Sequence, residues 1–259
     1  MKIAIIGCGN MGSALAKRLS LDNEVFLYDR NKTKIDHLQS QGFGISCETI
    51  EEALKEAEIL FLAIKPQSLE KAVENFNLKP SRYTIISLLA GINGSTLKRF
   101  FPSQKIVRIM PNLAISYGDG VVAVEEDKEM SSREKLYIGQ LLNPLGKVYW
   151  ISEAKMNAFT SLAGSGPAFF LTMIEAMIES GIAMGFTSQD ATDLTIQMMK
   201  GTLSVLEKSE KHPAELKWQV TSPAGTTIAG LAKLEETGLR NSIYQTFLAA
   251  YNRAHEFKT

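Results

Sequence analysis

Cysteine and net charge are both scarce in this sequence of 259 residues. Cys8 and Cys47 are its two cysteines, too few for a disulfide framework or a zinc cluster, and we expect no metal site. The 28 Lys and Arg residues balance 28 Asp and Glu residues, so the formal net charge is zero. A nucleic-acid-binding protein normally carries a cationic excess, because contacts to phosphates supply most of its affinity. The balance therefore argues against a nucleic-acid partner.

A long uncharged apolar run is also lacking. The longest candidate, residues 167–185, contains Glu175 and Glu179, and a membrane span tolerates few such charges. The apolar stretch after Met1 is too short for a signal peptide. Hydrophobic residues make up 45% of the chain, which is enough for a packed core. We therefore expect a globular protein of the cytoplasm with no membrane partner.

Short β-rich runs alternate with helix-like segments through the first part of the chain. This alternation is typical of a parallel sheet with helices on both faces, and it predicts an α/β fold with a doubly wound, Rossmann-type sheet. Strand cores dense in Ile, Leu and Val agree with burial on both faces. The expected strands are 2–6, 24–28, 59–63, 84–87 and 105–109, with a last pair at 120–125 and 147–151; the expected helices are 11–19, 32–41, 69–74, 95–100 and 131–142.

Strand-like runs end near residue 152, and helical patterns follow. They cover 154–162, 168–184, 188–206 and two further segments up to 257. The helix at 168–184 is apolar on most of its circumference, so it must be buried, and a small helical domain hides little surface alone. We expect burial between two subunits. The predicted organisation is a dinucleotide-binding domain at 1–152 and an all-α, dimerising domain at 153–259.

A glycine-rich motif, Gly7-Cys8-Gly9-Asn10-Met11-Gly12, follows the first expected strand and opens a helix. In such a motif the first glycine allows a tight turn and the second lets the backbone approach a pyrophosphate. The third permits close packing of helix on strand, and the helix N-terminus faces the phosphates. The strand–loop–helix context predicts dinucleotide binding. Cys8 is interpreted as a small residue filling the turn, because its sequence neighbours include no His or Lys that would activate a thiol.

The second expected strand ends in Tyr28-Asp29-Arg30-Asn31, and this end leaves the choice of cofactor open. An acidic residue at this distance from the glycines usually binds the ribose 2′-hydroxyl of NAD, whereas an arginine accommodates the 2′-phosphate of NADP. Arg30, supported by Asn31 and Lys32, favours NADPH, and Asp29 favours NADH. The alternative for Asp29 is a helix N-cap, a position that Asp occupies readily.

Further cofactor neighbours are expected where other strands end, because ligands of open α/β sheets bind outside the carboxyl edge. For Lys65 we favour a positional role at the cofactor over a catalytic one. The expected neighbours are Ala63, Lys65 and Pro66 after one strand, Ala90 and Gly91 after the next, and Pro111 and Asn112 after the fifth.

Two segments of the helical half consist of small and polar residues that helix packing alone does not require. One is Gly164-Ser165-Gly166-Pro167; the other is residues 220–228, which contain Ser222-Pro223-Ala224-Gly225-Thr226-Thr227. Each leads into a helix, and free backbone N–H groups at a helix start bind anions readily. The alternative is two ordinary, well-capped helix starts.

With these motifs in this order, the chain resembles the pyrroline-5-carboxylate reductase family. The resemblance covers nearly the whole chain, and its most specific part is the segment 212–240. One departure is Leu113-Ala114, where the family commonly has Thr-Pro after its MPN motif. The matching segments are, in order, GCGNMG, FLAIKPQ, SLLAGI, RIMPN, GSGPAFF, HPAELKWQVTSPAGTTIAGL and LEETGLR.

The resemblance implies an NAD(P)H-dependent reductase that converts 1-pyrroline-5-carboxylate to proline, with NADPH preferred. It also implies that two subunits interlock through the helical domain and build the substrate site at their interface. By position, Ser222, Gly225, Thr226 and Thr227 match residues that hold the substrate, and Glu210 matches a position near that pocket. Thr227 is the expected catalytic residue, offering its hydroxyl to the ring nitrogen.

Hydride transfer to a cyclic imine needs no strong protein acid, because a pyrroline nitrogen is basic enough for the substrate to arrive protonated. A site without paired carboxylates therefore suits this chemistry. We interpret His37, His212 and His255 as structural. The rival functions are a 3-hydroxyacid dehydrogenase, which would need a catalytic Lys that residues 161–171 lack, and a dinucleotide-binding regulator without turnover.

Overall fold

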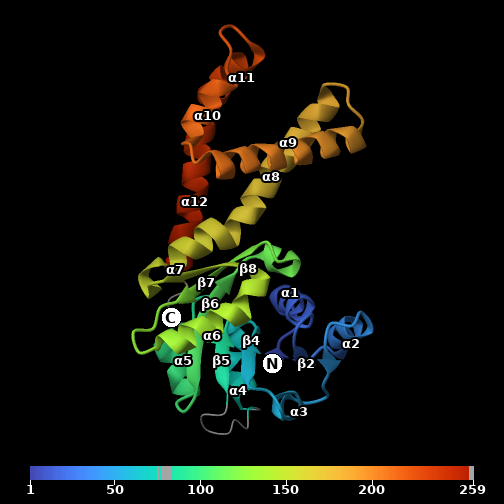
Figure 1. The fold of residues 1–259 in the computed structure, drawn as a ribbon, viewed down its shortest axis with the longest axis vertical. Helices are drawn as coiled ribbons and strands as arrows, with labels where there is room; N and C mark the ends of the chain where they lie inside the picture. The colour runs from blue at the N-terminus through green and yellow to red at the C-terminus, as the bar shows by residue number, and fades with distance from the viewer. Residues whose placement is uncertain (75, 77–82, 257–259) are drawn as a thin grey trace. The chain divides into compact units, whose positions relative to one another are not determined.

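The first part of the chain forms one eight-stranded sheet (Figure 1). The computed structural model describes residues 1–74, 76 and 83–256. The strands are β1 (Lys2–Ile6), β2 (Glu24–Tyr28), β3 (Ile45–Ser46), β4 (Ile59–Leu62), β5 (Thr84–Ser87), β6 (Lys105–Pro111), β7 (Gly120–Glu125) and β8 (Gly146–Ile151). The helices among them are α1 (Asn10–Leu19), α2 (Lys32–Ser40), α3 (Ile50–Leu54), α4 (Leu69–Val73), α5 (Gly94–Phe100) and α6 (Ser132–Leu142), with short 3₁₀ turns η1 (Pro66–Ser68), η2 (Leu113–Tyr117) and η3 (Asn143–Leu145).

The strand order is β3-β2-β1-β4-β5-β6-β7-β8, so the chain reverses its direction of travel between β1 and β4. Such a reversal leaves a crevice at the carboxyl ends of the two central strands, where ligands of doubly wound sheets bind. The strands from β3 to β6 pair in parallel, which confirms the Rossmann-type fold class.

One pairing departs from the expected parallel sheet. Strand β7 runs antiparallel to β6, with Met110 opposite Ala123. The reason is the connection, which holds one short turn, η2, and no crossover helix, whereas parallel strands need a longer return. Strand β8 is parallel to β7, because α6 supplies that return.

Alternate residues of the central strands enter two separate cores, one on each face of the sheet. Ile3 and Ile5 of β1 pack with side chains of α1, α2 and α6. Ala4 and Ile6 pack on the opposite face with side chains of α3, α4 and α5. Because both faces are buried, the strands are continuously apolar, and the helices hold the carboxyl ends of β1 and β4 in fixed positions.

The second part of the chain is helical, as expected from residue 152 onward. Helix α7 (Glu153–Phe159) passes through a π-helical turn, η4 (Thr160–Ser165), into α8 (Gly166–Ala183) without a break. The sequence predicts two separate helices here. After α9 (Ser188–Ser209) come α10 (Pro213–Gln219), α11 (Thr226–Glu236) and α12 (Leu239–Glu256), so the expectation of two further helices is wrong by one.

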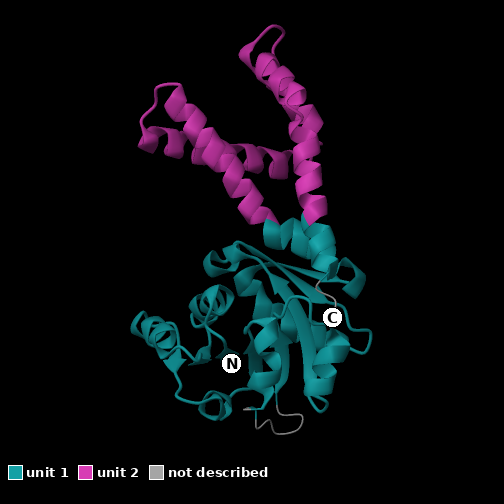
Figure 2. Cartoon of the chain, turned by 180° about the vertical axis from the view of Figure 1, so that it is seen from behind, with its two compact units in different colours: residues 1–165, 250–259 teal, residues 166–249 magenta. Residues whose placement is uncertain are grey.

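The chain folds into two compact units (Figure 2). One comprises Met1–Ser165 with Ala250–Thr259, and the other comprises Gly166–Ala249. The units divide at residue 165, after α7 and η4, whereas the expected domain boundary lies at 152. Met156 of α7 and Ser161 of η4 are buried, α7 contacts β7 and η4 contacts β6, so this stretch packs on the sheet.

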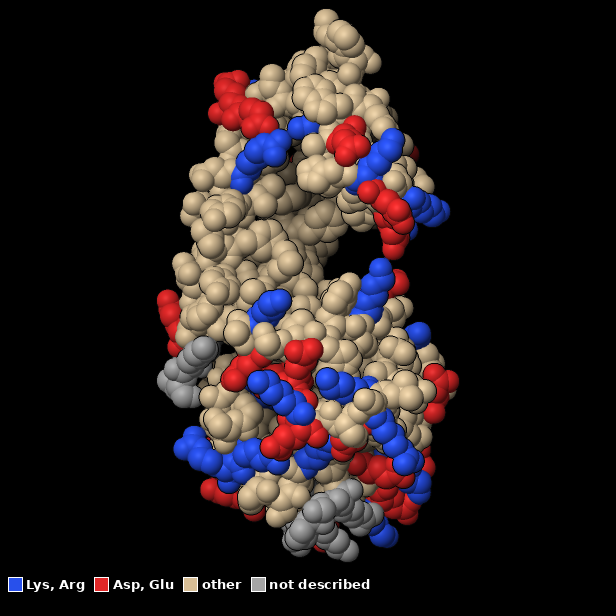
Figure 3. All heavy atoms as spheres, turned by 60° about the vertical axis from the view of Figure 1, so that its left-hand side comes forward, with Lys and Arg blue, Asp and Glu red and all other residues tan. Residues whose placement is uncertain are grey.

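The helical unit leaves much of its apolar surface uncovered in the single chain. Leu171, Met177 and Ile182 of α8 are between 43% and 56% exposed in the single chain. The sequence predicts that this helix is buried between two subunits, and the second subunit is not part of the structure. By length and composition Glu153–Ala183 passes as a membrane-crossing helix, and only 6% of its most apolar window is buried. On the face drawn in Figure 3, charges of both signs are interspersed over the sheet-containing unit, while the helical unit presents wide uncharged areas.

Candidate active site

The glycine loop after β1 is shaped by two contacts that exclude a side chain. Gly7 has a φ of +100°, and a Cβ there would lie 2.7 Å from the carbonyl oxygen of Ala63. A Cβ at Gly12 would overlap the carbonyl oxygen of Gly7. Gly9, the N-cap of α1, differs, because a Cβ there would meet nothing within 4 Å. The loop thus packs tightly against Ala63 and α1, while space is left beside Gly9. A pyrophosphate needs such space at the N-terminus of a helix.

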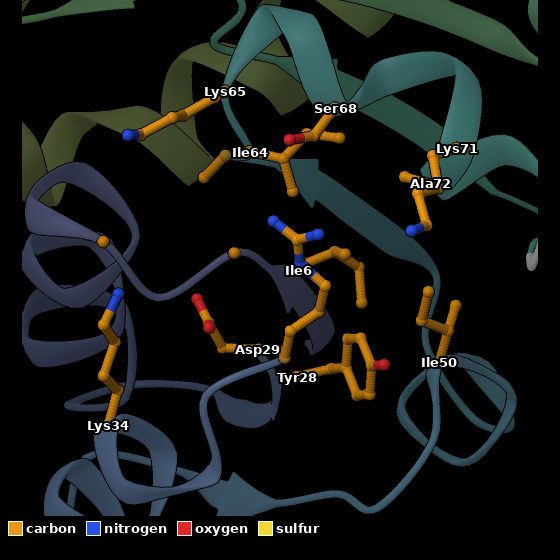
Figure 4. Close-up of a pocket in the computed structure, with 14 residues that line it drawn as sticks. Ile6, Tyr28, Asp29, Lys34, Ile50, Ile64, Lys65, Ser68, Lys71 and Ala72 are labelled. Carbon is orange, nitrogen blue, oxygen red and sulfur yellow. The ribbon is translucent and has the colours of Figure 1, made fainter.

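A pocket of about 220 Å³ lies beside this loop, between the ends of β1, β2 and β4 (Figure 4). It brings together several of the expected cofactor residues at the crevice where the strand order reverses. In Figure 4 the side chains of Lys34 and Lys65 extend toward the start of α1 from opposite sides. The expected residues that line the pocket are Gly7, Gly9, Asp29, Arg30, Ala63 and Lys65.

Asp29 joins the glycine loop to the end of β2. Its Oδ2 accepts the backbone N–H of Cys8 at 2.7 Å, and its Oδ1 accepts the backbone N–H of Asn31 at 2.8 Å. The N-cap of α2 is Asn31, whose side chain accepts the N–H of Thr33 at 3.1 Å. The alternative of Asp29 as a helix cap is therefore wrong, because Asn31 occupies that position.

Cys8 is a filling residue, as interpreted from the sequence. Its side chain is 2% exposed. Burial raises the pKa of the Cys8 thiol to about 12, and the Asp29 carboxylate acts in the same direction, while Lys34 opposes them weakly. A thiol in this environment stays protonated at neutral pH and is a poor nucleophile.

The other expected cofactor residues do not line this pocket. Asn10 lines a neighbouring hollow together with Gly9, and Met11 packs against the core under α1. Pro66 begins η1, directly after Lys65. Ala90 and Gly91 form the turn after β5, Pro111 ends β6, and Asn112 accepts the N–H of Val121 through its Oδ1 at 3.1 Å.

Several residues that line the pocket are not predicted from the sequence. Lys34 is one of them, and it adds a positive charge to the pocket. The sequence predicts that Lys32 supports Arg30 in favouring NADPH, but Lys32 forms an ion pair with Glu48, and Lys34 lines the pocket instead. Helical spacing from Arg30 does not predict this, because Arg30 precedes the extended N-cap Asn31 and lies outside α2. The remaining unpredicted lining residues are Ile6, Tyr28, Ile50, Ile64, Ser68, Lys71 and Ala72.

The small-residue segment of the helical unit forms a turn that leads into α11. The N–H of Gly225 donates to the carbonyl of Ser222 at 3.1 Å, and Ala224 takes a left-handed φ of 56°. Gly225 is the N-cap of α11 and has no side chain to cap the helix. Because the first helical bond runs from the N–H of Ala229 to Gly225, the N–H groups of Thr226 and Thr227 lie in the uncapped first turn.

Ser222, Gly225, Thr226 and Thr227, which the resemblance assigns to the substrate, lie in this one turn. Ser222 and Thr226 are exposed in the single chain, and Thr227 is half-buried. Glu210 ends α9 with a left-handed φ of 55°. Nearby His212 is the N-cap of α10, accepting the N–H of Ala214 at 3.2 Å, which is a structural role.

The comparisons with known proteins agree across the whole chain. The family model for pyrroline-5-carboxylate reductase dimerisation matches residues 153–257, and that for NADP oxidoreductase, coenzyme F420-dependent, matches residues 2–91. Pyrroline-5-carboxylate reductase of Synechocystis sp. is 33% identical over 99% of this chain and 98% of its own length.

Two solved structures show the same architecture. Pyrroline carboxylate reductase of Plasmodium falciparum, with NADP bound, has a TM-score of 0.90 and 26% identity, covering 100% of this chain and 98% of that one. The 1-pyrroline-5-carboxylate reductase of Streptococcus pyogenes has a TM-score of 0.89 and 29% identity, with 98% of each chain covered.

Proposed function

The chain belongs to the pyrroline-5-carboxylate reductase family, and from this premise we propose that it reduces 1-pyrroline-5-carboxylate to proline with NADPH. The observation that carries the proposal is that one chain contains two helix N-termini suited to binding anions. One is the glycine loop at α1, and the other is the uncapped turn at α11. They suit a dinucleotide and a small carboxylate respectively.

The residues present at α1 fit NADPH. The space in front of Gly9 admits a pyrophosphate, and the N–H groups of Asn10 and Met11 begin the helix there. Arg30 and Lys34 line the same pocket and supply the positive charge that a 2′-phosphate needs. When bound, the reduced nicotinamide supplies the hydride. NADH lacks the 2′-phosphate, so we propose that it serves as the weaker cofactor.

The residues at α11 position the substrate. The uncapped N–H groups of Thr226 and Thr227 receive the carboxylate, and the positive end of the helix dipole adds to their attraction. The Thr227 hydroxyl then meets the ring nitrogen and orients the imine carbon. Ser222 shapes the turn through its backbone carbonyl, which accepts the N–H of Gly225, and we propose that Glu210 lies near the bound substrate. Because the imine nitrogen arrives protonated, orientation contributes more than acid catalysis.

The helical domain makes the enzyme a homo-oligomer, in agreement with the dimerisation model that matches it. We propose that a second copy covers the exposed faces of α8 and α9. Leu171 and Met177 of α8 and Leu203 of α9 are each more than 40% exposed in the single chain. A covering subunit also accounts for the apolar stretch Glu153–Ala183 without a membrane. The cytoplasmic location and the lack of a nucleic-acid partner stay predictions.

A substrate panel tests the proposed function. The purified protein is incubated with NADPH and one of three compounds: 1-pyrroline-5-carboxylate, 1-pyrroline, which lacks the carboxylate, or glutamate, which lacks the imine. We expect cofactor oxidation with the first and at least about tenfold lower kcat/KM with the second, because the α11 turn loses its anion. Glutamate should give no oxidation. No oxidation of NADPH or NADH with 1-pyrroline-5-carboxylate would overturn the proposal.

A further inference from the structure

Asp29 occupies the position where a carboxylate commonly selects NAD, yet its bonds inside the chain point to another task. Its two oxygens each accept one backbone N–H, from Cys8 at 2.7 Å and from Asn31 at 2.8 Å. The first bond reaches across 21 residues to the glycine loop, and the second closes the turn that precedes α2. In Figure 4 the carboxylate is turned toward the loop between β1 and α1.

These bonds hold the loop in the form that the cofactor requires. The N–H of Gly7 donates to the carbonyl of Tyr28 at 2.8 Å, so two consecutive loop residues are tied to the end of β2. The Ser13 hydroxyl donates to the carbonyl of Cys8 at 3.0 Å, so the peptide units on both sides of the Cys8 Cα are held, one by Asp29 and one from the helix. With the Cys8 amide held inward, the loop turns outward at Gly9, where the backbone faces open space.

The charged residues around the pocket also indicate that Asp29 does not exclude a phosphate. Asp29 is the one acidic residue among the described residues that line it, alongside Arg30, Lys34, Lys65 and Lys71. Charge-assisted bonds to backbone N–H groups are about twice as strong as neutral ones, and they offset part of the carboxylate's negative charge. Four cations and one internally bonded carboxylate leave the pocket favourable to a phosphate.

We propose that Asp29 is a positioning residue that clamps the glycine loop for either dinucleotide, and that it takes no part in choosing between NADPH and NADH. Discrimination is left to the cations, with Arg30 the first of them. The proposal rests on the proposed function only in taking a nicotinamide dinucleotide as the ligand. It is tested by cofactor binding, so it is judged separately from reduction of the imine.

Equilibrium titration of the intact protein with NADPH and with NADH separates the clamp from a selector. Asp29→Ala removes both accepted bonds, and we expect both dissociation constants to rise roughly tenfold or more while their ratio stays within about twofold. Asp29→Asn keeps an acceptor oxygen and should rescue part of the loss for both cofactors. Arg30→Ala is the matched comparison, and it should weaken NADPH roughly tenfold and leave NADH nearly unchanged.

Two outcomes would overturn the clamp. Tighter NADPH binding by Asp29→Asn, or a ratio changed more than about fivefold, would make Asp29 a selector. Unchanged dissociation constants in both Asp29 variants would show that the loop needs no clamp. Thermal unfolding of each variant serves as the folding control, and Asp29→Asn keeps the test decisive if Asp29→Ala does not fold. Wild-type protein that binds dinucleotides without reducing the imine would refute the proposed function and leave the clamp standing.

Discussion

Single residues of the glycine loop differ in what they can tolerate, and the difference separates folding from binding. A methyl group at Gly12 would overlap the carbonyl of Gly7, so α1 could not pack on the loop. A methyl group at Gly9 would meet open space, and its φ of −73° suits any residue. We expect a side chain at position 9 to occupy the place proposed for the pyrophosphate.

We expect Gly12→Ala to lower both the melting temperature and the affinity for NADPH, with a loss of about 1–3 kcal/mol in the free energy of unfolding from overpacking. The matched variant Gly9→Ala should keep the wild-type melting temperature and lose only NADPH affinity. Thermal unfolding and cofactor titration measure the two effects. A Gly12→Ala protein with the stability and affinity of the wild type would refute the packing argument.

The hydroxyl of Thr227 is expected to act in the reaction through the ring nitrogen of the substrate. Thr227→Ala should lower kcat/KM by about ten- to a hundredfold, which corresponds to about 1.4–2.7 kcal/mol of transition-state stabilisation. Thr227→Ser keeps a hydroxyl and should recover most of the activity. Steady-state kinetics with 1-pyrroline-5-carboxylate check both variants, and unchanged kinetics in Thr227→Ala would reject the role.

Helix α6 has a full capping box at its N-terminus, and the stability that this cap contributes depends on pH. The Ser131 side chain and the Glu134 carboxylate form a reciprocal capping box, and Lys105 forms an ion pair with Glu134. These bonds, led by the one from Lys105, lower the pKa of Glu134 from its ordinary 4.5 to about 2. A lowered pKa means that the folded protein favours the charged form.

The stability that Glu134 contributes is therefore present above its ordinary pKa and lost as the pH falls toward about 2. We expect Glu134→Gln to be less stable than the wild type at neutral pH, and the difference to shrink steadily below about pH 4.5. Urea unfolding at a series of pH values measures it. A difference that stayed constant from neutral to acid pH would contradict the ion-pair and capping account.

Most elements could be predicted from the sequence because their apolar spacing is long and regular. The bounds expected for β1, β2, β5 and β7 agree with the structure. Strand β3 has two residues and α3 has five, too few for a pattern, and each is held by neighbours rather than by its own periodicity. The antiparallel β7 depends on the length of one connection. The continuity of α7 with α8 depends on a π-helical turn that no spacing rule anticipates.

In the candidate site, too, some residues could be predicted from the sequence and others could not. The glycine loop could be predicted because its motif states the backbone geometry directly. Lys71 could not, because it reaches the pocket from α4 through the packing of that helix beside the sheet. The task of Asp29 was also out of reach, since it depends on a bond to an amide 21 residues away.

At the scale of the whole molecule, we expect a second copy to cover the apolar surface that the helical unit exposes in the single chain. A second copy would cover Leu203 on α9, which is 53% exposed. We expect Leu203→Glu to shift the protein from dimer to monomer, because a buried charge without a counter-ion is costly at an interface. Reductase activity should fall with the dimer, since the exposed α11 turn is expected to complete its pocket there.

Leu21→Glu is the control, because it makes the same substitution at a leucine of the sheet-containing unit that is 60% exposed. Light scattering coupled to size-exclusion chromatography measures the mass, and the reductase assay measures activity. A Leu203→Glu protein that stays dimeric, or a Leu21→Glu protein that dissociates, would contradict the assignment of the interface to the helical unit.

The most direct test of the account is a product measurement on the wild-type protein. The protein is incubated with NADPH and 1-pyrroline-5-carboxylate, and the proline formed is quantified against the NADPH consumed. We predict one proline for each NADPH oxidised, with NADH supporting the same product at lower kcat/KM. Oxidation of NADPH without proline, or no oxidation with either cofactor, would contradict the account.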